Sequence, residues 1–169
     1  MTRPRINGVA PPDPLQTNQT YAQSHRQRFN MAGYAAPKLP TVRVGIIGLG
    51  NRGPGHLRTL IQIEGVEIRA LCDKNPDKVT TARKHLEHTD HAPALYSEGE
   101  DEWKKLCERD DIDLVFVTTP YYLHAPMAVY AMRQGKHVAS EVPAAGTMEE
   151  CWQLVQTAEE TRQHLMMLE

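Results

Sequence analysis

From Thr41 onward, short apolar runs alternate with segments of helical periodicity, and this alternation restricts the fold more than any other feature. The apolar runs predict strands at residues 42–47, 66–72, 94–96, 112–118, 137–140 and 165–168. The segments between them predict helices at residues 54–62, 76–88, 101–109, 125–133 and 147–163. Strands that are separated by crossover helices pair in parallel. The sequence therefore predicts an α/β fold with a doubly wound parallel sheet.

Residues 1–40 differ from the rest of the chain in composition. They hold six of the twelve prolines, and five basic side chains against one acid, without a sustained hydrophobic period. This composition predicts a disordered, Pro-rich leader at 1–40, followed by one domain at 41–169. The leader lacks the apolar core of a secretory signal, and Met31 is a second candidate for the start of the protein.

Charge, hydropathy and cysteine usage exclude several classes of protein. The net charge is −2, from 19 basic and 21 acidic side chains, so the chain lacks the basic footprint of a nucleic-acid-binding protein. Its apolar runs fall short of the roughly 20 residues that cross a bilayer. Cys72, Cys107 and Cys151 are widely spaced, and an odd, scattered set predicts free thiols in a reducing compartment. We therefore expect a cytoplasmic protein without nucleic-acid or membrane partners.

The strongest chemical signal is a G-x-G-x-x-G motif, formed by Gly48, Gly50 and Gly53 between the first strand and the first helix. The first glycine allows a tight turn, the second lets the backbone approach a pyrophosphate, and the third lets helix and strand pack closely. Asp73 follows the second strand, where an acid accepts hydrogen bonds from the adenosine ribose. Its charge repels a 2′-phosphate, although Lys74 beside it counters part of that effect. The motif predicts NAD, rather than NADP, as the cofactor.

Two further segments follow the fourth and fifth expected strands, at residues 119–124 and 135–143. Ligands of parallel sheets bind at the carboxyl ends of the strands, so the nicotinamide half of the cofactor is expected there. His124 in the first segment has two alternative roles, as a cap of the next helix or as a ligand contact.

Together these segments resemble the Gfo/Idh/MocA family of NAD(P)-dependent proteins over residues 42–169. The resemblance implies an NAD-binding Rossmann domain, with a C-terminal α/β substrate domain that is absent from these 169 residues. In most of that family the last segment reads Glu-Lys-Pro, and the lysine acts at the nicotinamide and the substrate hydroxyl. Val142 occupies the lysine position here, which argues against ordinary dehydrogenase chemistry.

One branch of this family, the NAD-dependent glycosidases of glycoside hydrolase family 109, is similar to the chain in four segments. They are the Glu-Val-Pro-Ala-Ala segment at 141–145 and residues 50–55, 150–155 and 166–169. The resemblance implies transient oxidation of a sugar at C3, elimination at C1, addition of water and return of the hydride. The sugar and the acid/base residues belong to the second domain in that branch, so no catalytic residue is expected in this chain. Two alternatives are a sugar or polyol dehydrogenase and a non-catalytic NAD-binding remnant, and a homo-oligomer is compatible with the longer form.

The resemblance also assigns parts of the cofactor to individual residues. Asn51 and Arg52 are expected on the pyrophosphate side, and Asp73 at the ribose. Tyr121, His124, Glu141 and Val142 are expected at the nicotinamide end. The full set expected to bind NAD is Gly48, Gly50, Asn51, Arg52, Gly53, Asp73, Thr119, Pro120, Tyr121, Leu123, His124, Glu141 and Val142.

Other side chains carry weaker signals. His85, His88 and His91 have the spacing of zinc ligands on a helix, but they lie at a charged helix end, which favours a solvated surface. Trp103 is interpreted as part of the apolar face of a short helix. The glycosidase branch resembled here also has a tryptophan at this position, which leaves packing and cofactor contact as alternatives. No metal site is expected.

Overall fold

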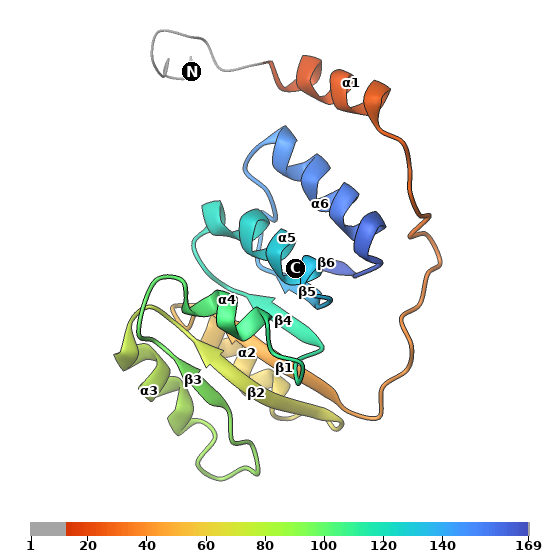
Figure 1. Ribbon diagram of the computed structural model, residues 1–169. Helices are drawn as coiled ribbons and strands as arrows, with labels where there is room; N and C mark the ends of the chain where they lie inside the picture. Colours follow the sequence, from red (N-terminus) through yellow and green to blue (C-terminus); the bar gives the residue numbers. More distant parts are fainter. Residues whose placement is uncertain (1–12, 169) are drawn as a thin grey trace, which may run out of the picture.

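The computed structural model describes residues 13–168, and its centre is a six-stranded parallel sheet (Figure 1). The strands are β1 Val42–Ile47, β2 Val66–Cys72, β3 Ala94–Tyr96, β4 Leu114–Val117, β5 His137–Ser140 and β6 Leu165–Met167. Their order is β3-β2-β1-β4-β5-β6, and neighbouring strands pair in parallel. The strand order reverses between β1 and β4, so a ligand crevice is expected at their carboxyl ends.

Helices cover both faces of this sheet. The helices of the described chain are α1 Pro14–Ser24, α2 Gly53–Leu60, α3 Pro76–Lys84, α4 Glu102–Cys107, α5 His124–Arg133 and α6 Met148–Thr161, with a 3₁₀ turn, η1, at Tyr121–Leu123. Side chains of α2 and α3 pack in one buried cluster, and those of α4, α5 and α6 in another. The expected doubly wound α/β fold is therefore confirmed.

Strand β4 shows why the sheet is buried on both faces. Val115 and Val117 belong to the cluster with α4, α5 and α6, whereas Phe116 belongs to the cluster with α2 and α3. Successive side chains of a strand point to opposite faces, so a strand between two helical layers must be apolar throughout. The apolar run of β4 is continuous in the sequence because both faces of the strand are buried.

Local capping signals set several helix ends. The Thr147 hydroxyl accepts a hydrogen bond from the Glu150 N–H at 3.1 Å, and the Glu150 carboxylate accepts one from the Thr147 N–H at 3.2 Å, which completes a capping box. Helix α3 ends at Lys84 rather than near residue 88. Beyond it, the N–H groups of residues 85, 86 and 89 bond to carbonyls three residues earlier, so the chain closes into tight turns instead of continuing the helix.

Helix α1 lies in the segment for which the sequence predicts no regular structure. The Asp13 carboxylate accepts a hydrogen bond from the Leu15 N–H at 3.0 Å and caps the helix. The Trp152 indole of α6 donates to the Asn18 side chain at 3.0 Å, and its ring stacks on Tyr21 with centroids 6.2 Å apart. Because these contacts join segments far apart in the sequence, residues 14–24 show no hydrophobic periodicity from which the helix could be predicted. Residues 1–12 of the expected leader lie outside the described residues, and the domain boundary at residue 41 stays a prediction.

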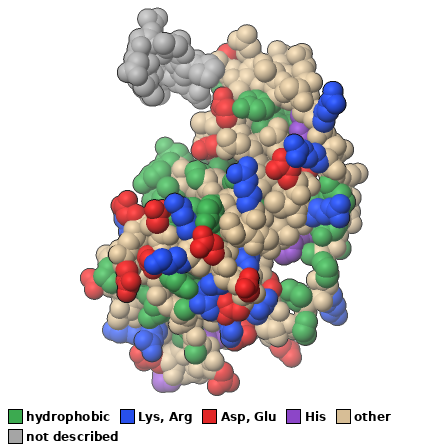
Figure 2. Space-filling model, viewed as in Figure 1, with side chains coloured by type: hydrophobic (Ala, Val, Ile, Leu, Met, Phe, Trp, Pro, Cys, Tyr) green, Lys and Arg blue, Asp and Glu red, His purple; other side chains and the backbone are tan. Residues whose placement is uncertain are grey.

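After α1, the chain runs along the outside of the molecule, past α6, before it enters β1 (Figure 1). Figure 2 shows acidic and basic side chains interspersed over the lower part of the face that it presents. The salt bridges of the described chain include Arg109–Asp111 and Arg69–Asp111. Within residues 13–168, none of the helices combines the length and the apolar character that a membrane crossing requires.

Candidate nucleotide-binding site

The glycine motif forms the turn between β1 and α2, and its three glycines have different surroundings. Gly48 has φ +93°, and a β-carbon there would lie 2.7 Å from the Thr118 carbonyl group. A β-carbon at Gly53 would lie 2.1 Å from the Gly48 carbonyl oxygen. At Gly50 a β-carbon would meet only the Lys78 ammonium, at 3.5 Å. The outer glycines therefore serve packing, and the middle one leaves the backbone open to a ligand.

The turn is held by hydrogen bonds from neighbouring strands. The Gly48 N–H donates to the Cys72 carbonyl at 2.8 Å, and the Leu49 N–H donates to Asp73 Oδ2 at 2.7 Å. Asp73 Oδ1 accepts a second hydrogen bond from the Asn75 N–H at 2.9 Å. Asp73 thus positions the glycine turn, and each carboxylate oxygen keeps a further lone pair for a hydroxyl donor.

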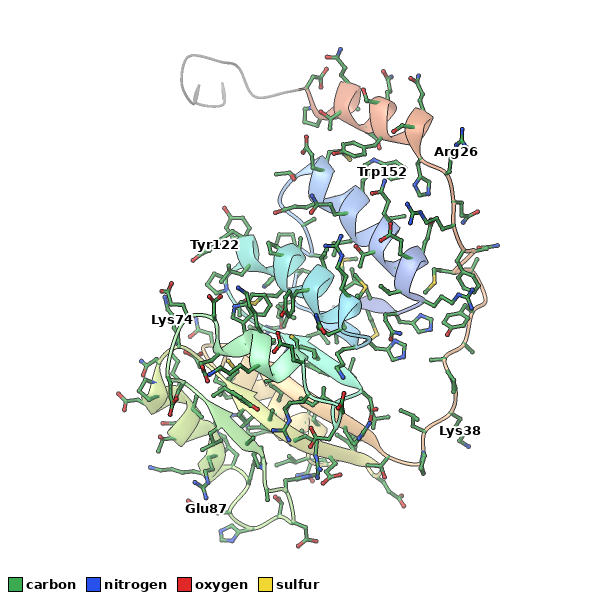
Figure 3. The ribbon with its side chains drawn as sticks, in the orientation of Figure 1. Arg26, Lys38, Lys74, Glu87, Tyr122 and Trp152 are labelled. Carbon is green, nitrogen blue, oxygen red and sulfur yellow. The ribbon has the colours of Figure 1, made fainter. Side chains whose placement is uncertain are left out.

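A cavity of about 730 Å³ opens at the carboxyl ends of β1, β2 and β4. This volume is in the range of sites for small ligands and cofactors. Eight of the thirteen expected cofactor-binding residues line it: Gly48, Gly50, Asn51, Arg52, Asp73, Thr119, Pro120 and Leu123. Lys74 and Tyr122 line it as well and lie on the same side of the molecule (Figure 3).

The sequence analysis missed several other lining residues, including Lys78, Glu100, Thr118 and Met127. Trp103 lines the cavity too, while its ring packs edge-on against Tyr130 with centroids 5.1 Å apart. Trp103 therefore packs as part of a helix face, as interpreted, and also borders the cavity. Their place in the sequence could have identified these residues, because they lie in or near the segments that follow the carboxyl ends of β2, β3 and β4.

Glu141 is buried at the end of β5, where it joins the glycine turn rather than lining the cavity. Its Oε1 accepts hydrogen bonds from Arg52 Nε at 2.9 Å and lies 2.6 Å from His56 Nε2. Burial raises the pKa of Glu141, but the hydrogen bonds from His56 and Arg52 outweigh it, and the pKa is lowered overall. Glu141 is therefore a charged anchor for Arg52, which does line the cavity.

His124 is buried, and its ring does not line the cavity or cap α5. Its Nδ1 lies 2.8 Å from the Pro143 carbonyl oxygen, and its Nε2 lies 2.8 Å from the Thr119 carbonyl oxygen. The ring thus connects the loop after β4 with the loop after β5. Of the two roles that the sequence leaves open, the geometry shows neither, because the ring positions backbone instead.

The other expected residues at the nicotinamide end are on the surface. Tyr121 is 58% exposed and Val142 is 37% exposed, and neither lines the cavity. Gly53 is buried under the turn, where a β-carbon would meet the Gly48 carbonyl oxygen. The assignment of these three residues to the cofactor stays a prediction.

The histidines at positions 85, 88 and 91 do not form a metal site. Within residues 13–168, no three His, Cys, Asp or Glu side chains are placed to hold a metal ion together. His91 Nδ1 accepts a hydrogen bond from the Ile68 N–H at 3.3 Å. This ring therefore contributes to the end of β2.

Comparisons with known proteins show which family this chain is related to. The chain is 54% identical over 151 residues to an alpha-N-acetylgalactosaminidase from Bacteroides fragilis, covering 89% of this chain and 34% of the relative. It is 50% identical over 157 residues to a glycosyl hydrolase family 109 protein from Porphyromonas gingivalis, covering 92% and 33%. The chain thus spans about one third of the length of these relatives.

A solved structure of myo-inositol 2-dehydrogenase from Lactobacillus plantarum superposes with a TM-score of 0.64 at 26% identity, covering 75% of this chain and 36% of that one. Residues 42–168 match the Gfo/Idh/MocA family, described as an oxidoreductase family with an NAD-binding Rossmann fold. The resemblance to this family and to its glycosidase branch is thereby confirmed. The chain belongs to the Gfo/Idh/MocA family, and residues 42–168 are its NAD-binding Rossmann domain.

Proposed function

We propose that this chain is the cofactor-binding part of an NAD-dependent glycosidase of the family 109 type. The observation that carries the proposal is Val142 at the lysine position of the dehydrogenases, in a chain 54% identical to a relative named alpha-N-acetylgalactosaminidase. Without an ammonium at this position, the chain itself lacks the group that the dehydrogenases of the family use at the substrate hydroxyl.

The residues of the cavity fit the parts of a dinucleotide. The open backbone at Gly50 and the N-terminus of α2 suit the pyrophosphate, because the partial positive charge of a helix N-terminus favours anions. Asp73 has free lone pairs for ribose hydroxyls. Thr119, Pro120 and Leu123 line the side toward β4 and β5, where the nicotinamide half is expected.

Bound NAD⁺ would supply reversible hydride transfer, in which a hydride leaves C3 of the sugar and later returns to it. The ketone at C3 would make the proton at C2 more acidic. In our proposal, this chain binds and orients the dinucleotide. The sugar, and the groups that move protons at C2 and C1, belong to a second α/β domain outside these residues. A cytoplasmic location and a homo-oligomeric longer form are also part of the proposal.

A sugar or polyol dehydrogenase is the second candidate, and the match to the myo-inositol 2-dehydrogenase structure favours it. The two candidates differ in the fate of the hydride. A dehydrogenase releases one reduced cofactor for each sugar, whereas a glycosidase of this type returns the hydride and needs only catalytic amounts of NAD⁺.

Calorimetric titration of the 169-residue chain with NADH tests cofactor binding. The matched variant is Gly50→Ala, since a methyl group there meets only the flexible end of Lys78 and blocks close approach of a pyrophosphate. We expect wild type to bind, and Gly50→Ala to bind at least about tenfold more weakly with an unchanged melting temperature. Equal binding by both proteins would contradict this site.

A chimera tests the glycosidase. Residues 42–168 replace the matching part of the Bacteroides fragilis relative, and the release of nitrophenol from a nitrophenyl α-N-acetylgalactosaminide is followed together with NADH absorbance. We expect nitrophenol release without accumulation of NADH. NADH formed in proportion to the sugar consumed would favour the dehydrogenase instead.

A further inference from the structure

Lys78 reaches from α3 across the cavity to the glycine turn. It follows the N-cap Asn75 within the first turn of α3, and its ammonium lies 3.5 Å from the point where a β-carbon on Gly50 would be. The second glycine of the motif is the point at which the backbone comes closest to a pyrophosphate. The ammonium therefore lies beside the place where the ligand's phosphates are expected.

Within residues 13–168, no carboxylate forms a salt bridge with this ammonium. Of the acids that line the cavity, Asp73 accepts backbone N–H groups with both oxygens, and Asp101 pairs with Lys104 at 2.8 Å. Glu100 lines the cavity as well, and it forms no salt bridge with Lys78. An exposed ammonium at the edge of a cavity, without an anion from the described protein, is available to an anionic ligand.

Two other positive groups meet at the same place. The first turn of α2 contains no acid to offset the partial positive charge of its N-terminus. Arg52 bonds to Glu141 through Nε, and within residues 13–168 its Nη groups have no hydrogen-bond partner. Arg52 also lines the cavity. Of the two side-chain cations near Gly50, Arg52 shares its charge with Glu141, whereas Lys78 has no carboxylate partner within residues 13–168. Lys78 is therefore the cation that is available to a pyrophosphate at this place.

We propose that Lys78 is a cofactor-binding residue that contacts the pyrophosphate of the dinucleotide across Gly50. The proposal rests on the proposed NAD binding and adds to it a side-chain contact from α3. It also separates the two lysines of this region. Lys78 lies opposite Gly50 and acts on the pyrophosphate, whereas Lys74 directly follows Asp73, on the ribose side.

The test compares Lys78→Met, which removes the charge and keeps the length, with Lys78→Arg, which keeps the charge. Lys84→Met is the matched control, because Lys84 is exposed on the same helix and does not line the cavity. We expect Lys78→Met to raise the Kd of NADH and of ADP-ribose about tenfold or more. We expect Lys78→Arg to restore most of the affinity, and Lys84→Met to bind as wild type does.

Two further ligands, which differ from NADH in their phosphates, identify the group that Lys78 contacts. Adenosine lacks phosphates, so its affinity should be the same for wild type and Lys78→Met. NADPH carries an additional 2′-phosphate, and a loss of affinity confined to NADPH would overturn the pyrophosphate contact. Binding of NADH by Lys78→Met within about twofold of wild type would overturn it as well. If wild type bound neither NADH nor ADP-ribose, the proposed function itself would fail, which is a different result.

Discussion

At the scale of single residues, two glycines of α2 have opposite requirements although they are two positions apart. A β-carbon at Gly53 would lie 2.1 Å from a backbone oxygen, and one at Gly55 would meet nothing within 4 Å. We expect Gly53→Ala to lower the free energy of unfolding by about 2 kcal/mol or more. Gly55→Ala should raise it by about 0.5 kcal/mol, because alanine loses less backbone entropy in a helix. Urea denaturation measures both, and equal effects would show that the turn is not packed this tightly.

The three cysteines are predicted to differ in reactivity. Cys72 and Cys107 are buried, and burial raises the pKa of each thiol to about 12. Cys151 is exposed on α6. Since the thiolate is the nucleophile, we expect one fast-reacting thiol with Ellman's reagent at pH 8, and three after denaturation. Cys151→Ser should abolish the fast phase, and a fast phase that persists would mean that a buried thiol opens to solvent.

The glycine motif predicts where the cavity lies, but it does not predict which side chains contact one another around it. The spacing from Gly48 to Asp73 predicts that the turn and this acid lie close together, and both line one cavity. The motif did not reveal that His124 bonds to two carbonyls or that Glu141 holds Arg52. Those partners are up to 89 residues apart in the sequence, and only the packing of loops brings them together.

At the scale of elements, the docking of α1 on α6 depends on aromatic contacts around Trp152 (Figure 3). We expect Tyr21→Ala to lower the free energy of unfolding by about 1 kcal/mol, since it removes the ring that stacks on Trp152. Leu15→Ala on the same helix is the control, because Leu15 is 71% exposed, and it should change stability by less than about 0.5 kcal/mol. Tryptophan emission should shift to the red in Tyr21→Ala only. Equal stability of both variants would show that α1 does not stay docked.

A charge network fixes the end of α4 and the start of β4 against β2. Hydrogen bonds from Arg109 lower the pKa of Asp111 to about 2, and Arg69 of β2 adds to this effect. The folded pKa lies below the ordinary value of 3.8, so the stabilisation is complete above about pH 4 and is lost as the pH falls toward 2.

We therefore expect Asp111→Asn to be less stable than wild type by about 1–2 kcal/mol at pH 7, with a smaller difference at pH 3. Asp90→Asn is the control, because Asp90 is exposed and forms no salt bridge within the described chain. Urea denaturation from pH 3 to 7 provides the comparison. A difference that does not change with pH would mean that the carboxylate's charge is not what stabilises this junction.

Strands and helices differ in how well the sequence predicts their limits. The strands at 42–47, 66–72, 94–96 and 137–140 have the predicted limits. In β1, β2 and β5 the apolar run ends where the strand leaves the core, whereas β3 has no buried residue and is short. Helix ends depend on hydrogen bonds after the last apolar residue, and α3 stops earlier than its periodicity indicates. Helix α1 was missed because its stability comes from α6 rather than from its own apolar face.

At the scale of the whole molecule, the nucleotide site and the docked N-terminal segment use different parts of the fold. The cavity is built by segments that follow β1, β2, β3 and β4, whereas α1 contacts α6. No residue of the α1–α6 contact lines the cavity. Changes in regions that share no partners add in free energy, so ligand binding and α1 docking should stabilise the domain independently.

Thermal unfolding with and without NADH measures this independence. A ligand that binds only the folded state stabilises it by RT ln(1 + [L]/Kd), about 2.7 kcal/mol at a hundredfold excess over Kd. We expect Tyr21→Ala to lower the melting temperature equally in both conditions, so that NADH produces the same shift in wild type and variant. Lys78→Met should behave in the opposite way. Without NADH its melting temperature should equal that of wild type, and the same NADH concentration should raise it by less. A reduced NADH shift in Tyr21→Ala would instead mean that the N-terminal segment and the cofactor site are energetically coupled.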